Sequence, residues 1–191
     1  MLQTNDLVTL VNEQDEVIGQ MDKLEAHRDG GKLHRAISIF LFRTNEAGVL
    51  ELLIQQRSDQ KIVGARQWAN TACGNVWPGE SYKQCAQRRL WVELGVGDDQ
   101  LVLTDVHHFQ YQVRCNEQFG ENELDHVFVG QFDGSCQPNS QEVSEIAWVA
   151  WSEVVNQDWR RQSQYDWAPW FEIMTSSEQL VQTVSQHAKR N

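Results

Sequence analysis

Stretches of apolar residues divide the chain into short segments that are typical of a mixed β-sheet. Residues 35–43 are rich in β-branched and aromatic side chains, which indicates a buried strand. A polar turn at 45–48 separates them from residues 50–56, so we expect these two strands to pair as a hairpin. We predict further strands at residues 7–11, 16–20, 67–74, 101–115, 124–132 and 145–150.

Three segments have helical character. Residues 81–94 read as a helix, because Ser81 and Gln84 form a capping-box pair at its start and Gly95 stands where a C-terminal cap belongs. A short helix is expected from residue 151 to 155, and the tail from 169 to about 188 is expected to be helical. The predicted fold is α/β (α+β), with a mixed β-sheet sandwiched between helices in one domain spanning 1–191 and a helical tail at about 165–188.

Composition narrows the range of functions. The 191 residues suit one domain, and 16 basic against 27 acidic residues give a net charge of −11. We therefore expect no nucleic-acid partner and no binding to an anionic membrane. The chain shows no signal sequence, and its four cysteines form no CxxC pair, so we expect a cytoplasmic protein with free thiols.

Residues 74–96 carry the most informative motif. Gly74 is followed by Glu80, Arg88, Glu93 and Gly95 at spacings that resemble the Nudix box, a loop–helix–loop that binds a metal–diphosphate. Generic Nudix hydrolases carry a Glu directly after the Arg and two adjacent Glu residues later in the helix. Here Arg89 and Val92 replace two of these carboxylates, so one interpretation is that Glu93 keeps a metal-binding role while hydrolysis is lost. The alternative is that Arg89 and Glu93, four residues apart, form only an ion pair on the helix face.

Other residue types around the box suggest acid–base and metal chemistry. Cys73 directly precedes the box, where it is either a small buried residue or an acid/base candidate. Glu121 and Glu123 would point to the same face if the strand that follows begins early. With His27 and His34 they form a plausible set of ligands for a divalent metal, although solvated surface histidines are the commoner case.

Taken together, these motifs resemble those of the type I isopentenyl-diphosphate isomerases, a Nudix subfamily, from about residue 7 to 171. The matching positions are Lys23, His27, His34, Arg57, Lys61, 68–74, the box through 92–96, Tyr111, 121–123 and Trp170. The resemblance implies an isomerase of isoprenoid precursor biosynthesis that interconverts isopentenyl and dimethylallyl diphosphate.

The resemblance also implies roles for individual residues. Cys73 and Glu123 would face each other across the substrate, one protonating the alkene and the other removing a proton. Trp170 would stabilise the tertiary carbocation between these steps and exclude water, and Tyr111 would orient the glutamate.

Two metal sites and a diphosphate site are implied in the same way. His27, His34, Glu121 and Glu123 would hold a catalytic divalent metal, which is Mn²⁺, Mg²⁺ or Zn²⁺. Glu93 would serve a Mg²⁺ on the diphosphate, whose oxygens would be neutralised by Lys23, Arg57, Lys61 and Arg89. The subfamily places a third metal histidine two residues after the catalytic cysteine, where this chain has Asn75. An amide is a weaker ligand than imidazole, and His107, His108 or His126 are candidates to compensate.

Two other functions are consistent with parts of the sequence. A divergent Nudix hydrolase of isoprenoid or nucleotide diphosphates would need a carboxylate that activates water, and the altered box argues against it. A non-catalytic binding domain would have no use for Cys73, Glu123 and Tyr111 together. For each function we expect a monomer whose partner is a small-molecule diphosphate.

Overall fold

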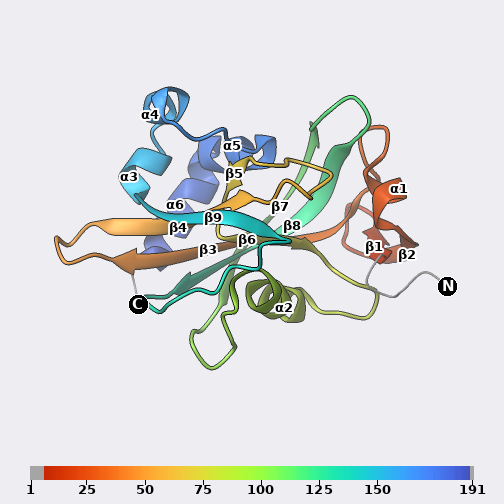
Figure 1. Ribbon diagram of the computed structural model, residues 1–191. Helices are drawn as coiled ribbons and strands as arrows, with labels where there is room; N and C mark the ends of the chain where they lie inside the picture. Colours follow the sequence, from red (N-terminus) through yellow and green to blue (C-terminus); the bar gives the residue numbers. More distant parts are fainter. Residues whose placement is uncertain (1–6, 190–191) are drawn as a thin grey trace.

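The computed structural model describes residues 7–189, which form a nine-stranded sheet with helices on its faces (Figure 1). In chain order the elements are β1 (Leu7–Val11), β2 (Val17–Asp22), α1 (Lys23–His27), β3 (His34–Thr44), β4 (Leu50–Arg57), β5 (Trp68–Ala69), β6 (Ala72–Asn75), α2 (Tyr82–Leu94), β7 (Thr104–Arg114), β8 (Gly120–Gln131), β9 (Val143–Ala150), α3 (Trp151–Val154), α4 (Gln157–Gln162), α5 (Pro169–Ser176) and α6 (Glu178–Ala188). Together with the matches reported below, this arrangement confirms the predicted α+β class.

Strand β3 is the centre of the sheet. It runs parallel to β8 from the pair His34–Glu123 to the pair Phe42–Gln131, and antiparallel to β6 from Ala36–Asn75 to Ile39–Ala72. Its far end pairs with β4, which confirms the expected hairpin, although the two strands share only the last three pairs before the turn. Residues that lie far apart in the sequence therefore meet on either side of β3.

The two faces of the sheet bury two separate apolar cores. On β3, Ile37, Ile39 and Leu41 pack on the side of α2, whereas Phe40 and Phe42 pack against α3, α5 and α6. In Figure 1, α2 lies below the sheet, and α3, α4 and α5 lie above it. Because side chains alternate along a strand, every second residue of β3 and β8 faces the tail helices.

The helix at 81–94 is confirmed, with Ser81 as its N-cap and both bonds of the capping box present. The strand predicted at 67–74 is instead two short strands, β5 and β6. Asn70 and Thr71 interrupt it because their buried side chains donate hydrogen bonds to main-chain carbonyls of neighbouring strands, at Ile39 (3.2 Å) and Leu53 (2.6 Å). This break separates the segment that carries Cys73 from β5.

Other elements also differ from the prediction. Strand β8 begins at Gly120 rather than at residue 124, so Glu121 and Glu123 lie within the strand. The helical tail is divided in two, because the Ser177 side chain caps a new helix, α6. The short helices α1 and α4 were not predicted, since five or six residues are too few to show a helical period.

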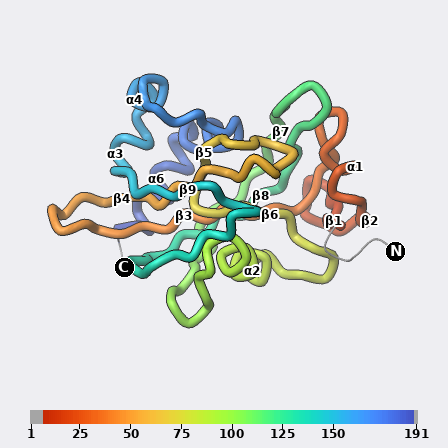
Figure 2. Tube along the Cα trace, in the orientation of Figure 1, coloured from red at the N-terminus to blue at the C-terminus, as the bar shows by residue number. Residues whose placement is uncertain are grey.

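The segment that follows α1 meets the turn between β7 and β8. An isolated bridge joins Arg28 to Phe119, so the connection between α1 and β3 lies beside the β7–β8 turn, as Figure 2 shows. No helix among residues 7–189 is long and apolar enough to cross a membrane.

Candidate active site

His27 and His34 enter the site from either side of one loop. His27 ends α1, a short helix that Asp22 caps by accepting bonds from the amides of Leu24 and Glu25, and His34 begins β3. His27 Nδ1 lies 2.6 Å from the carbonyl of Lys23, and His34 Nδ1 lies 2.7 Å from that of Lys32. These contacts place the proton on Nδ1 and leave both Nε2 atoms directed into the site, as is usual for histidines that bind metals.

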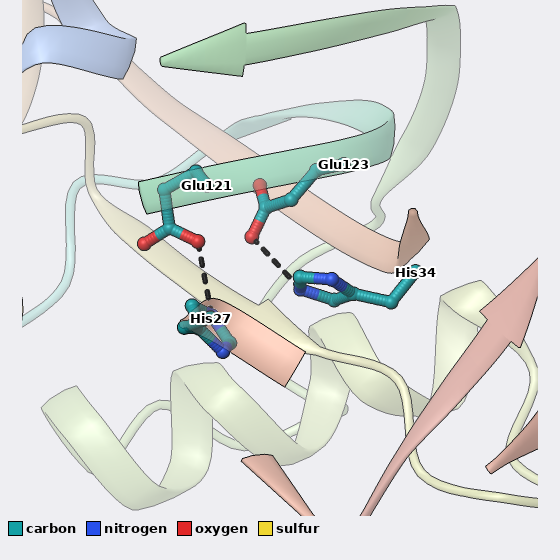
Figure 3. Close-up of side chains that lie close together, drawn as sticks. All are labelled: His27, His34, Glu121 and Glu123. Carbon is teal, nitrogen blue, oxygen red and sulfur yellow. Dashed lines mark ion pairs between the residues drawn. The ribbon is translucent and has the colours of Figure 1, made fainter. Parts of the chain in front are cut away.

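Glu121 and Glu123 meet these imidazoles from β8. They are two residues apart on the same face of the strand, and Glu123 is the register partner of His34. His27 Nε2 lies 2.9 Å from Glu121 Oε2 and His34 Nε2 lies 3.5 Å from Glu123 Oε1 (Figure 3). One ligand atom from each of the four residues lies within 4.8 Å of the others, and all four side chains are buried.

The bonding of this cluster fits a cation between its members. Glu121 Oε2 is buried and has no hydrogen-bond partner among the described residues, although His27 Nε2 is near it. Burial opposes ionisation of Glu121, but the contact with His27 and the charge of this imidazole when both of its nitrogens are protonated outweigh it and lower the pKa of the carboxyl to about 2. Two imidazole nitrogens and two carboxylates suit a divalent ion such as Mn²⁺, Mg²⁺ or Zn²⁺.

Asn75 lies at the edge of this cluster. Its Nδ2 is 2.9 Å from His34 Nε2 and 3.3 Å from Glu123 Oε1, a geometry in which the amide donates to both atoms. A metal would bind the amide oxygen rather than the NH₂ group, and a rotation of the Asn75 amide would exchange the positions of these two groups. The three candidate substitutes lie elsewhere. His126 is on the other face of β8, with its ring centroid 3.7 Å from that of Tyr82, and His108 stacks on His126. His107 is the register partner of Val127, four residues beyond Glu123 along β8.

Cys73 and the Glu123–Tyr111 pair lie on the face of the sheet that carries the metal cluster. Cys73 Sγ donates to Asn70 Oδ1 at 3.1 Å, and burial raises the pKa of the thiol to about 12. The Tyr111 hydroxyl donates to Glu123 Oε2 at 2.5 Å. Cys73 is thus a neutral thiol at physiological pH, and Glu123 is held by its second oxygen.

The alternation that places the two glutamates continues to a third carboxyl, Asp125. This residue is fully buried, accepts a bond from Ser38 Oγ at 2.7 Å, and has no partner for Oδ1 among the described residues. Burial, and then the charge of Glu123, raise its pKa well above the ordinary value. The spacing Glu-x-Glu-x-Asp was the signal that sequence reasoning missed.

The four predicted cations converge at one end of the site. Burial lowers the pKa of Lys23 to about 8, and the charges of Lys61, Arg89 and Arg57 contribute to this shift. Gly74 makes room for one of them, because a Cβ there would lie 2.5 Å from Arg89 Cγ. Four cations close enough to oppose one another's charge form a suitable cradle for a diphosphate.

A carboxylate that the sequence did not single out already bridges two of these cations. Glu142 Oε2 accepts bonds from Lys61 Nζ and, at 2.8 Å, from Arg89 Nη2. Burial opposes ionisation of Glu142, but the charges of Arg89 and Lys61 lower its pKa to about 2. No motif marks Glu142, since it stands alone in a loop before β9.

Both carboxylate oxygens of Glu93 accept hydrogen bonds. Arg89 donates to Oε1 at 2.6 and 2.9 Å, and Gln55 Nε2 donates to Oε2 at 2.5 Å. The ion pair on the helix face, considered as the alternative, is therefore present. A metal at Glu93 would have to displace one of these donors.

Trp170 covers the site from the first turn of α5. Its side chain is buried, its Nε1 has no hydrogen-bond partner among the described residues, and the Arg57 guanidinium lies 5.0 Å from its ring centroid. The main chain leading to α5 is tied to β5, since Trp68 N donates to Asp166 O at 2.7 Å and Ala168 N donates to Trp68 O at 2.8 Å. The tail thereby holds the indole over the sheet.

Comparisons with solved structures support the fold. A Deinococcus radiodurans protein superposes with a TM-score of 0.69 at 22% identity, over 88% of this chain and 96% of that one. A Nudix hydrolase from M. smegmatis gives a TM-score of 0.59 at 16% identity, over 85% of this chain and 94% of that one. These likenesses establish the architecture.

Comparisons of sequence establish the family. The NUDIX domain profile matches residues 32–171. A Nocardia farcinica protein named isopentenyl-diphosphate Delta-isomerase is 43% identical over 149 residues, 77% of this chain and 81% of that protein. A protein of the same name from Pectobacterium atrosepticum is 34% identical over 166 residues, 87% of each. The chain therefore belongs to the NUDIX domain family and, within it, to the isopentenyl-diphosphate Delta-isomerases.

Proposed function

We propose that this protein interconverts isopentenyl diphosphate and dimethylallyl diphosphate, as the names of its relatives indicate. The observation that carries the proposal is the placement of Cys73 and the Glu123–Tyr111 pair on one face of the sheet, next to four converging cations. The cations suit the diphosphate, and the two polar side chains suit proton transfer at the hydrocarbon end. We further propose that the chain is one domain and acts as a monomer.

Protonation of the alkene requires an acid that stays neutral until it reacts. Cys73 fits, since burial raises the pKa of its thiol to about 12, so that the thiol keeps its proton. In the free protein the S–H donates to Asn70 Oδ1, and it turns from this acceptor toward the alkene to react. In the forward direction the thiol proton adds to the terminal CH₂ carbon. The π electrons form the new C–H bond, and a tertiary carbocation remains at C3.

The second step removes a proton from C2 and restores the double bond between C2 and C3. Glu123 accepts this proton, and the Tyr111 hydroxyl bonded to Oε2 holds the carboxylate in place. Trp170 presents an aromatic face that stabilises the carbocation and excludes water, which would otherwise trap it as an alcohol. The reaction is redox-neutral, and one proton is gained as another is lost.

His27, His34, Glu121 and Glu123, with Asn75 at the edge, would hold a divalent metal, and Glu93 would hold a Mg²⁺ that accompanies the diphosphate. When bound, such ions supply positive charge that orients the carboxylates and the phosphate oxygens. Lys23, Arg57, Lys61 and Arg89 bind the diphosphate directly. The native metal is proposed as Mn²⁺, Mg²⁺ or Zn²⁺.

The main competing function is hydrolysis of a diphosphate. Helix α2 offers one carboxylate, Glu93, and both of its oxygens are bonded, by Arg89 and Gln55, so no free carboxylate of α2 is placed to activate water.

Four unpaired cysteines are in keeping with a reducing compartment such as the cytoplasm. We therefore propose that the protein acts in the cytoplasm.

Purified protein incubated with isopentenyl diphosphate, with and without Mg²⁺ and Mn²⁺, tests the proposal. The expected product is dimethylallyl diphosphate, formed without release of phosphate. Phosphate release without isomerisation would instead support the hydrolase.

A further inference from the structure

The loop at 58–67, between β4 and β5, touches both the diphosphate cradle and the aromatic lid. Arg57, at the end of β4, donates from Nε and Nη2 to the carbonyl of Val63 at 3.2 and 3.0 Å. The next residue, Gly64, accepts a main-chain bond from Gln67 at 3.1 Å, which closes the loop toward β5. The same loop therefore holds the guanidinium and approaches Trp170.

Gly64 is packed against both groups. Its φ is +62°, and a Cβ at this position would lie 2.7 Å from Trp170 Cη2 and 3.3 Å from Arg57 Nε. The first distance is too short for any real contact, so the edge of the indole occupies space that only glycine leaves free. Trp170 and the loop are complementary at this point.

No hydrogen bond to the described residues fixes the indole, because Trp170 Nε1 is buried without a partner. Its position is therefore set by packing, and the absence of a side chain at Gly64 leaves the space that the edge of the indole fills. The Arg57 guanidinium lies 5.0 Å from the centroid of the same ring. In the proposed reaction the carbocation would face the same indole ring as this guanidinium. The distance between Arg57 and Trp170 therefore affects both the diphosphate end and the hydrocarbon end of the substrate.

We propose that Gly64 is a positioning residue that keeps the Arg57 guanidinium and the Trp170 indole at a fixed separation, and that it thereby couples diphosphate binding to carbocation stabilisation. The proposal rests on the isomerase function proposed above. It assigns no contact with substrate to Gly64. A side chain there would displace the indole and the guanidinium together.

The test compares two glycines with left-handed backbones. Gly64→Ala and Gly48→Ala both place an alanine at positive φ, but a Cβ at Gly48 (φ +77°) has no atom within 4 Å. Gly48→Ala should lose thermal stability from backbone strain alone, whereas Gly64→Ala should lose this amount and more, because its methyl also meets the indole. Only Gly64→Ala should lower kcat, by about tenfold, and weaken the binding of inorganic diphosphate measured by calorimetry several-fold.

A double-mutant cycle with Trp170→Phe shows whether the effect passes through the indole. A phenyl ring lacks Cη2, so it leaves room for the alanine methyl. In the Trp170→Phe background, Gly64→Ala should change kcat by less than about twofold, a non-additivity expected of groups in contact. If Gly64→Ala alone does not fold, recovery of folding in the Trp170→Phe background supports the same contact.

Equal kcat and diphosphate affinity for the two alanine variants would overturn the proposal, as would an undiminished effect of Gly64→Ala beside Trp170→Phe. Failure of the isomerase function is a separate outcome. It would appear as wild-type protein that binds inorganic diphosphate but forms no dimethylallyl diphosphate. The calorimetric comparison of the two glycines still decides the positioning role in that case.

Discussion

Two groups of carboxylates in this protein differ in how many hydrogen-bond and ion-pair partners they have. At the box, Glu93 is bonded by Arg89 and Gln55, and Glu142 is bonded by Arg89 and Lys61. At the His/Glu cluster, Glu121 has one imidazole nearby and an oxygen without a hydrogen bond. The difference indicates that the box helix has become a rigid support for the cations, whereas the cluster is arranged for a metal.

The largest effect is expected next to the cluster, at Cys73. Cys73→Ala removes the thiol proton and should reduce the rate by about a hundredfold or more, as expected for a positioned acid. The control is Cys136→Ala, since Cys136 packs on the opposite face of the sheet with the α2 core. Unchanged turnover in Cys73→Ala would remove the proposed mechanism.

The same substitution made in the two groups should give different results. Glu121→Gln should weaken Mn²⁺ binding by about a hundredfold, because it removes a charged ligand. Glu93→Gln should leave Mn²⁺ affinity within about twofold in the absence of diphosphate. It should instead cost about 2 kcal/mol of unfolding free energy, since the half-buried Arg89 loses a charged partner. Similar metal affinities in the two variants would show that the two groups of carboxylates do not differ in metal binding.

Substitutions at Trp170 separate aromatic stabilisation of the carbocation from packing of the core. Trp170→Leu should lower kcat by about thirtyfold, the value of a cation–π contact of about 2 kcal/mol in a dry site, and Trp170→Phe should retain more activity. Trp151→Phe is the matched control, because Trp151 packs in the same core but its Nε1 donates to Ser185 at 2.7 Å. That control should lose stability without losing kcat, and activity that merely tracks thermal unfolding in all three variants would reduce Trp170 to a core anchor.

A substitution at Asn75 should raise the metal affinity of the His/Glu cluster. Asn75→His places an imidazole beside His34 and Glu123 and should tighten metal binding by about tenfold, with activity preserved or raised at limiting metal. Metal titrations of the wild type, Asn75→His and Asn75→Ala measure this. Equal affinities in all three proteins would show that Asn75 takes no part in the metal site.

The smallest effect is expected in the acid stability of the bonded network at the box. The pKa of Glu142 is lowered to about 2, so its contribution to stability is present above the ordinary value of 4.5 and is lost as the pH falls from 4.5 toward 2. Glu142→Gln should therefore flatten the fall in Tm over this range. Identical profiles for wild type and Glu142→Gln would mean that the two ion pairs add nothing to stability.

The sequence predicted those parts of the site that depend on periodicity and local motifs. Glu121 and Glu123 followed from the alternation of a strand, and the α2 cap followed from Ser81 and Gln84. Glu142 could not be predicted, because its partners lie in two other segments and its neighbours in the chain carry no pattern. The orientation of Asn75 was equally inaccessible, since it depends on contacts made across β3 with His34 and Glu123.

The arrangement of the site also bears on how the chain acquires activity. His27 lies near one end of the chain and Trp170 near the other, and the segment before Trp170 is held by main-chain bonds to β5. Such long-range contacts form late, because closing a large loop is entropically costly. A ribosome-bound chain that has not yet exposed α5 would have its sheet residues but no cover over the reacting carbon. If Trp170 covers the reacting carbon as proposed, turnover requires that α5 has docked beside β5, so the onset of activity during synthesis would report the formation of this late contact.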